Sequence, residues 1–109
     1  MTDGISINYF GDKEWYLNGK LHREDGPAVE YPDGTKKWYV FGLLHRETGP
    51  AIEFANGDKY WYQNGLPHRE DGPAFEILHR SKEWFFNGEQ IYCKTNEEFL
   101  RIVKLKAFL

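Results

Sequence analysis

The sequence predicts a mainly β protein: an elongated, single-layer antiparallel β-meander of tandem 23-residue hairpin repeats with a C-terminal capping α-helix. Two observations predict this fold. Tryptophan recurs every 23 residues with the same residues around it, and after residue 94 the apolar residues change to helical spacing. A fixed period of this length indicates repeats that bury each other's faces. The tryptophans are Trp15, Trp38, Trp61 and Trp84.

Each repeat begins with a predicted strand around its tryptophan. In the first repeat Lys13, Trp15 and Leu17 alternate with Glu14 and Tyr16, which is the pattern of a strand with two different faces. The pair Asn-Gly then ends the segment. This pair is the commonest signal for a two-residue hairpin, because both positions need positive φ. Each repeat is therefore expected to fold back on itself here.

A second strand is predicted in each repeat after a Gly-Pro pair, which interrupts the ladder. These second strands cover residues 27–31, 50–54 and 73–77. With an opening strand at residues 5–10 the chain has about eight strands and no parallel crossover. The sheet therefore consists of an N-terminal strand within residues 1–11 and four repeats over residues 12–93, of which the last is truncated.

The end of the chain follows a different pattern. Thr95-Asn-Glu-Glu98 is a capping-box signal for the start of a helix, and apolar residues from Phe99 onward recur at helical spacing. We expect a helix over residues 95–109 that covers the last strand or one sheet face, because an uncovered sheet edge invites aggregation. Residues 1–109 then form a single repeat domain.

The repeat resembles the MORN repeat and its variant forms. The pattern W-x-x-N-G-x-x-H, with D-G closing a 23-residue unit, matches from about Asp12 to Gln90. It looks closest to small proteins of phages, bacteria and large DNA viruses that carry tandem W-Y-x-N-G-x-x-H-R-E-D-G-P-A units and a short helical tail. The resemblance implies the architecture. It does not imply the lipid-binding or junctional roles of some MORN proteins, because His22-Arg-Glu-Asp-Gly-Pro replaces their H-G-x-G.

Charge and composition exclude several classes of function. The formal net charge is −3, and residues 94–109, with four basic and two acidic side chains, leave −5 on residues 1–93. Nucleic-acid binding is not expected, since it needs a basic stripe. Membrane binding is not expected either, because the apolar face of the helix is needed as a cap.

The sequence also predicts a location. The start, Met1-Thr-Asp-Gly, has no basic region followed by an apolar run, and 18 apolar residues never occur in succession. The single cysteine, Cys93, excludes an internal disulfide and fits a reducing compartment. We expect a cytoplasmic location, which is the host cytoplasm if a phage encodes the chain.

Charged residues gather in each repeat between the Asn-Gly turn and the Gly-Pro pair. As a metal site they would fail, because equivalent histidines of adjacent repeats should lie about 9–10 Å apart and cannot share one ion. As an acid/base site they lack an enclosed pocket, and Thr48 replaces the carboxylate of Asp25 and Asp71. We expect a structural corner, in which arginine pairs with a carboxylate of the adjacent repeat or stacks on tryptophan. Its residues are His22, Arg23, Glu24, His45, Arg46, Glu47, His68, Arg69 and Glu70.

The four tryptophans form an aromatic ladder that admits two interpretations. Packed above the small residues Ala28, Ala51 and Ala74 they would be core residues. Exposed, they would be a stacking platform for bases or sugars. The low mean hydropathy of −0.71 leaves few other core residues, which favours packing.

Departures from the repeat carry more functional information than its consensus, because the architecture does not require them. Phe41 replaces the turn asparagine, and a bulky residue at positive φ predicts a remodelled turn. With Leu43 and Leu44 it forms either an exposed apolar knob for a protein partner or a group tucked beneath the sheet. His79 and Arg80 replace an Asp-Gly or Asn-Gly turn and predict a longer loop near the helix.

These observations predict a non-enzymatic protein-binding module, for instance a small phage-type inhibitor or adaptor that acts on a host defence protein through one sheet face and the Phe41 corner. Two alternatives remain. One is a sequestering protein that holds a nucleotide or glycan on the aromatic ladder, and the other is a hydrolase or nuclease that uses a charged corner. No cofactor and no metal is expected, and the open sheet is compatible with a homodimer.

Overall fold

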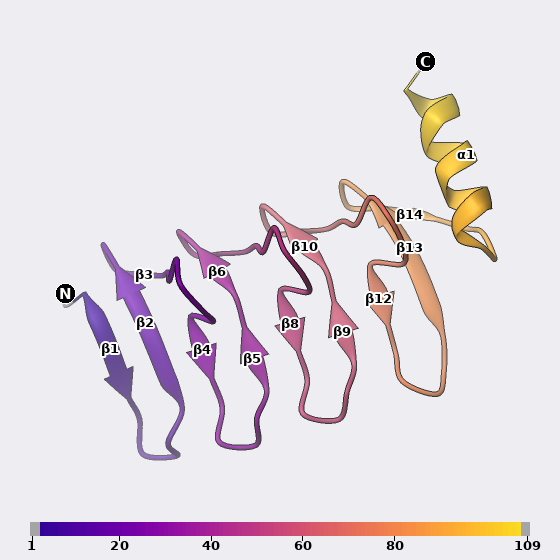
Figure 1. Cartoon of the computed structure of the whole chain (residues 1–109). Helices are drawn as coiled ribbons and strands as arrows, with labels where there is room; N and C mark the ends of the chain where they lie inside the picture. The colour runs from indigo at the N-terminus through magenta and orange to yellow at the C-terminus, as the bar shows by residue number, and fades with distance from the viewer. Residues whose placement is uncertain (1–2, 108–109) are drawn as a thin grey trace.

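The computed structural model describes residues 3–107 and confirms the predicted fold class (Figure 1). The molecule measures 46 × 32 × 18 Å, and its strands follow one another from the N-terminus to a single helix, α1 (Asn96–Lys106), beyond the last repeat. The last two residues of the predicted helix, 108–109, lie outside the described residues. No helix within residues 3–107 has the length and apolar character to cross a bilayer.

Eight strands form the predicted meander, each antiparallel to the next. Their lower parts in Figure 1 make one continuous sheet, and the ladders between neighbouring strands have two to four residue pairs. In order they are β1 (Gly4–Ile7), β2 (Lys13–Leu17), β4 (Val29–Glu30), β5 (Lys36–Lys37), β8 (Ile52–Glu53), β9 (Lys59–Tyr60), β12 (Phe75–Glu76) and β13 (Lys82–Phe86).

Beyond each tryptophan the chain turns back in a short hairpin. The hairpins pair β2 with β3 (Lys20–Leu21), β6 (Tyr39–Val40) with β7 (Leu43–Leu44), β10 (Tyr62–Gln63) with β11 (Leu66–Pro67), and β13 with β14 (Glu89–Ile91). Hydrogen bonds join successive hairpins, since the amides of Gly42, Gly65 and Gly88 donate to carbonyls of the preceding repeat at 2.8 Å. The hairpins therefore form a second ladder along the top of the sheet.

The predicted remodelling of the Phe41 turn is wrong. Phe41 has φ 47° and Gly42 has φ 82°, close to the 50–51° and 76–85° of the three Asn-Gly turns. The reason is the preceding repeat: the Phe41 amide donates to His22 Nδ1 at 3.0 Å, and the two rings pack at a tilt of 38° with centroids 4.3 Å apart. These contacts hold phenylalanine in a conformation that it otherwise rarely adopts.

The predicted longer loop at His79 is also wrong. The turn from β12 to β13 has the length of the other lower turns, because the Ile77 amide donates to the Ser81 carbonyl as the Tyr31 amide donates to that of Thr35. The positive φ of this turn lies at His79, with φ 61°, one position before the place that Gly34 and Gly57 occupy in the other turns, so the backbone differs although the length does not. The turn lies at the lower end of the sheet, whereas α1 lies at the upper end (Figure 1).

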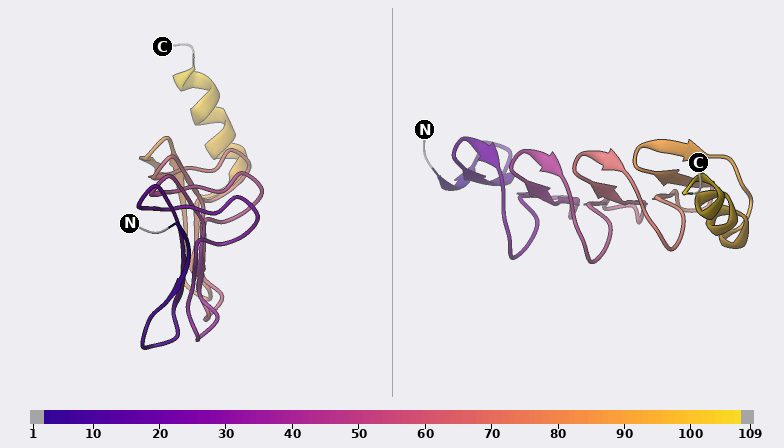
Figure 2. Two further views of the ribbon diagram at one scale, coloured as in Figure 1. Left: turned by 90° about the vertical axis from the view of Figure 1, so that its left-hand side faces the viewer. Right: turned by 90° about the horizontal axis from the view of Figure 1, so that it is seen from above.

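The two faces of the sheet have different residues. On one, here called the corner face, each of the first three tryptophans lies opposite an alanine that is completely buried: Ala28, Ala51 or Ala74. On the other, the aromatic face, Tyr60 stacks on Phe75 with centroids 4.4 Å apart. The charged corners project from one side of the sheet and the Asn-Gly hairpins lie on the other (Figure 2).

Helix α1 covers the last tryptophan. Its N-cap Thr95 accepts a hydrogen bond from the Glu98 amide at 3.1 Å, as the capping signal predicts. Phe99, which is fully buried, packs in one cluster with Trp84 and Ile91. The helix thus buries the last tryptophan, and its C-terminal half projects beyond the sheet (Figure 1).

Candidate functional site

Three corners stand over the corner face, formed by the His-Arg-Glu-Asp-Gly segments at residues 22–26 and 68–72 and the His-Arg-Glu-Thr-Gly segment at residues 45–49. In each corner the arginine guanidinium lies over the tryptophan of its own repeat, with its central carbon 3.7–3.9 Å from the ring centroid. Such a cation–π contact contributes roughly 0.5–2 kcal/mol. The glycine that ends the corner leaves room for the stacked arginine, because a Cβ added at Gly26 would lie only 3.0 Å from the Arg23 guanidinium.

Of the two arginine contacts that the sequence suggested, the structure shows the stacking on tryptophan, while the carboxylates that each arginine contacts come from its own repeat and not from the adjacent one. Arg23 Nε donates to Asp25 Oδ1 at 2.9 Å, and its Nη1 lies 3.6 Å from Glu30. In the third repeat Arg69 makes the same contacts with Asp71 and Glu76, at 2.8 and 3.0 Å. The arginine reaches its own repeat because each corner folds back over its own tryptophan.

The second repeat differs at one contact. Arg46 stacks on Trp38 and its Nη1 donates to the Pro50 carbonyl and to Glu53, at 3.1 and 3.0 Å. Thr48, however, stands where the other corners have aspartate. Among the described residues, Arg46 Nε–H therefore has no hydrogen-bond acceptor.

The corner histidines connect neighbouring repeats. His22, His45 and His68 each accept a backbone N–H from the hairpin turn of the next repeat, at 2.8–3.0 Å on Nδ1. An Nδ1 that accepts an N–H carries no proton, so Nε2 is the nitrogen of each ring that is left to donate. The Nε2 atoms lie 3.4–3.5 Å from the glutamate two residues on.

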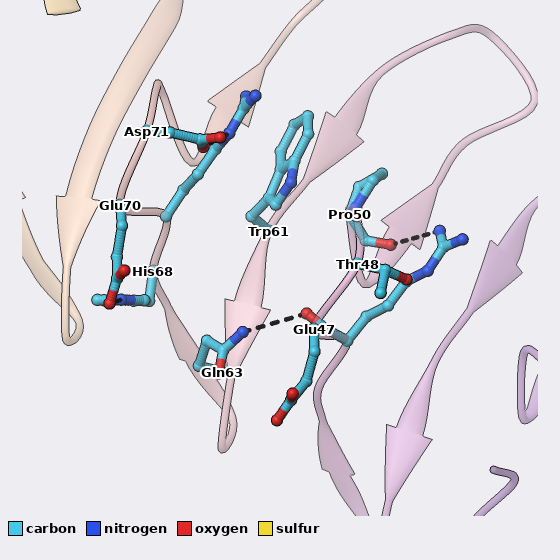
Figure 3. A pocket seen from close by; sticks show the side chains of 11 residues that line it. Glu47, Thr48, Pro50, Trp61, Gln63, His68, Glu70 and Asp71 are labelled. Atoms are coloured by element: carbon cyan, nitrogen blue, oxygen red, sulfur yellow. Dashed lines mark hydrogen bonds and ion pairs between the residues drawn. The ribbon is translucent and has the colours of Figure 1, made fainter.

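Two grooves separate the three corners. One, with a volume of about 650 Å³, runs between the second and third corners, with Thr48 and Pro50 on one wall and Trp61 and Asp71 on the other (Figure 3). The other, of about 710 Å³, runs between the first and second corners and is lined by Asp25, Trp38 and Thr48 among others. Both are open troughs, and their linings repeat with the 23-residue period.

The tryptophans are not a free stacking platform. Trp15, Trp38 and Trp61 are half-buried, with an arginine on one ring face, and Trp84 is buried beneath α1. Trp84 Nε1 also donates to Asn96 Oδ1 at 2.9 Å.

An exposed apolar row lies along the hairpins. Phe41, Leu43 and Leu66 are 52%, 49% and 48% exposed, and we call them the apolar rim. Leu44, predicted as part of this surface, is half-buried, whereas Leu66 was missed although it occupies the same place in its repeat as Leu43. Successive turns touch along the rim, since a Cβ at Gly65 would lie 3.3 Å from the Leu43 side chain.

The remaining predicted binding residues do not join this surface. His79 and Arg80 are exposed in the lower turn, at the opposite end of the sheet from the hairpins (Figure 1). Cys93 lies beneath α1, where burial, and secondarily the charge of Glu98, raises the pKa of its thiol. Within residues 3–107 no three His, Cys, Asp or Glu side chains form a group that could hold a metal ion.

Comparison with family models, curated proteins and solved structures finds no match to this chain.

Proposed function

We propose that this chain is a non-enzymatic protein-binding module that acts as a small inhibitor or adaptor and docks through the apolar rim. The observation that carries the proposal is the rim itself. Phe41 occupies a positive-φ position that costs a non-glycine residue on the order of 1–3 kcal/mol, where the other three repeats have asparagine. Phe41 packs on His22, yet it stays 52% exposed, so it offers a partner a rigid aromatic anchor.

The structure of the corners supports this function over the two alternatives. A nucleotide or glycan platform needs open aromatic faces, and an arginine occupies a face of Trp15, Trp38 and Trp61. A hydrolase needs one distinct, enclosed site, whereas the corners recur with nearly the same contacts and line open troughs.

Affinity capture from an extract of the native host tests the proposal. The wild-type chain should retain a protein partner, and Phe41→Asn, which restores the consensus turn, should weaken binding by about ten- to a hundredfold because one large apolar side chain is lost. Leu43→Asp should act in the same direction.

Leu78→Asp is the matched control, since Leu78 is 51% exposed but lies in a lower turn, away from the rim. It should bind as the wild type does. Retention of no protein by the wild type, or equal retention by all four chains, contradicts the proposal.

A further inference from the structure

The three corners can be compared at the position two residues after the arginine, which is aspartate in the first and third corners and threonine in the second. In the first and third repeats an aspartate accepts the arginine Nε–H, at 2.9 and 2.8 Å. In the second repeat Thr48 replaces this aspartate, yet the Arg46 side chain keeps its position. It stacks on its tryptophan and donates to a proline carbonyl at 3.1 Å, as the other two arginines do. Its side chain is 25% exposed, against 24% and 21% for the other two. The second corner therefore holds a positioned guanidinium with one donor unused.

The unused donor is open to solvent. Within the described residues, His22 Nε2 is the only buried side-chain nitrogen or oxygen without a hydrogen-bond partner, so Arg46 Nε is not enclosed. Arg46 and Thr48 line both grooves, and Thr48 is exposed. The donor therefore belongs to a 25% exposed side chain at the wall that the two grooves share.

The surrounding charges define which group fits. Glu47 and Glu53 are the acidic neighbours of Arg46. The first and third corners have glutamates at the same two places, and there the arginine also holds an aspartate. The second corner can therefore accept one further carboxylate. A phosphate brings more negative charge than the position holds elsewhere, and the same glutamates repel it. The planar guanidinium matches carboxylate geometry, and such charge-assisted hydrogen bonds are about twice as strong as neutral ones.

We propose that the Arg46–Thr48 position binds an aspartate or glutamate carboxylate of the protein partner, which accepts the Arg46 Nε–H as Asp25 and Asp71 do in their own repeats. This inference rests on the proposed function and adds the chemistry of the partner. Because the corners and the hairpins lie on opposite sides of the sheet, the partner reaches over the upper end of the sheet, with an acidic side chain at the second corner and an apolar surface against the rim. Val40, next to Phe41 in the chain, lines one of the two grooves.

Nuclear magnetic resonance of the arginine Nε–Hε groups tests the site on the isolated chain. The probe is N-acetylglutamate α-amide, which carries one carboxylate. We expect a saturable shift of the Arg46 Nε–Hε signal and little change at Arg23 and Arg69, whose donors are occupied. Thr48→Asp should abolish the response, and Asp71→Thr should give Arg69 the response of Arg46. Backbone amide spectra of both variants establish that they remain folded.

Several outcomes overturn the inference. Equal shifts of all three arginines would indicate a nonspecific effect of charge. A silent Arg46, or a response that persists in Thr48→Asp, would place the carboxylate elsewhere or nowhere. Saturation by inorganic phosphate at lower concentration than by the glutamate derivative would assign the site to phosphate.

The captured partner separates this inference from the proposed function. Thr48→Asp should weaken its binding roughly ten- to a hundredfold, the effect of losing a hydrogen bond to a charged group. If Phe41→Asn loses the partner while Thr48→Asp does not, the rim binds and the carboxylate inference is wrong. If Arg46 responds to the probe but the wild type captures no protein, the proposed function fails and the carboxylate site remains.

Discussion

Replacing His68 by alanine should destabilise the whole repeat array. His68 is 9% exposed, its Nδ1 accepts the Asn87 amide at 2.8 Å, and its ring contacts Phe86 with centroids 4.7 Å apart. The substitution removes the acceptor of a hydrogen bond between two repeats and half of an aromatic pair. Because each repeat is ordered mainly by its neighbours, the loss acts on the interface between the third and fourth repeats.

The magnitude follows from these two contacts. An amide that loses its partner costs about 1–3 kcal/mol, toward the low end here because water can reach the exposed turn. The aromatic contact contributes about 0.5–1.5 kcal/mol. The free energy of unfolding should therefore fall by about 2–3 kcal/mol, or about 8–15 °C in melting temperature for a domain of this size. Urea unfolding followed by tryptophan fluorescence measures it.

Two further variants identify the cause. His68→Asn keeps an acceptor near the position of Nδ1 and loses the ring, so it should retain about half of the lost stability. His79→Asn changes an exposed histidine at φ 61°, which asparagine tolerates well, and should be neutral within about 0.5 kcal/mol. If His68→Ala is as stable as His79→Asn, the histidine does not connect the repeats and the architectural explanation of the corner is refuted.

Two other predictions concern the covered end of the sheet. Phe99→Ala should lower the free energy of unfolding by about 3–5 kcal/mol, because Phe99 is fully buried in one cluster with Trp84. Leu100→Ala, at a 44% exposed position, should lower it by less than about 1 kcal/mol. Similar losses of the two variants in thermal unfolding would contradict the packing of α1. Cys93 should react with iodoacetamide near pH 8 more slowly in the folded chain than in urea, because burial and Glu98 raise the pKa of its thiol and disfavour the thiolate. Since the folded chain binds this proton more tightly, the contribution to stability is fully present below the ordinary pKa of the thiol and is lost as the pH rises through the higher pKa of the folded chain. Glu98→Gln should speed the reaction modestly, and equal rates in folded and unfolded chains would show that the thiol is not shielded.

Much of the fold follows from local sequence patterns. The alternation around each tryptophan, the Asn-Gly pairs and the capping signal at Thr95 depend on residues within a few positions of one another. Their outcomes, antiparallel hairpins and a single helix, are those that the structure shows. The acceptance of Phe41 in an Asn-Gly type of turn was not predictable in this way, because its stabilising contacts come from His22 in another repeat.

The candidate site was predictable in residue type but not in pairing. The sequence identified Phe41, Leu43 and the corner residues as groups of interest, and it showed that Thr48 breaks the aspartate pattern. The 23-residue period also places Leu66 where Leu43 stands, a signal that was missed. The sequence could not show that the missing aspartate leaves a donor of Arg46 open, because that depends on which acceptors surround the guanidinium in the folded chain.

The sequence by itself determined the 23-residue repeat, the order and direction of its strands and the helical end of the chain, because periodicity and turn chemistry are local properties. Only the tertiary structure decided which groups meet between repeats. The histidine of one repeat accepts a backbone amide 19 residues further on, and backbone amides look alike at every position of a sequence. Their partners become known only when the stacking of the repeats fixes which amide faces which ring.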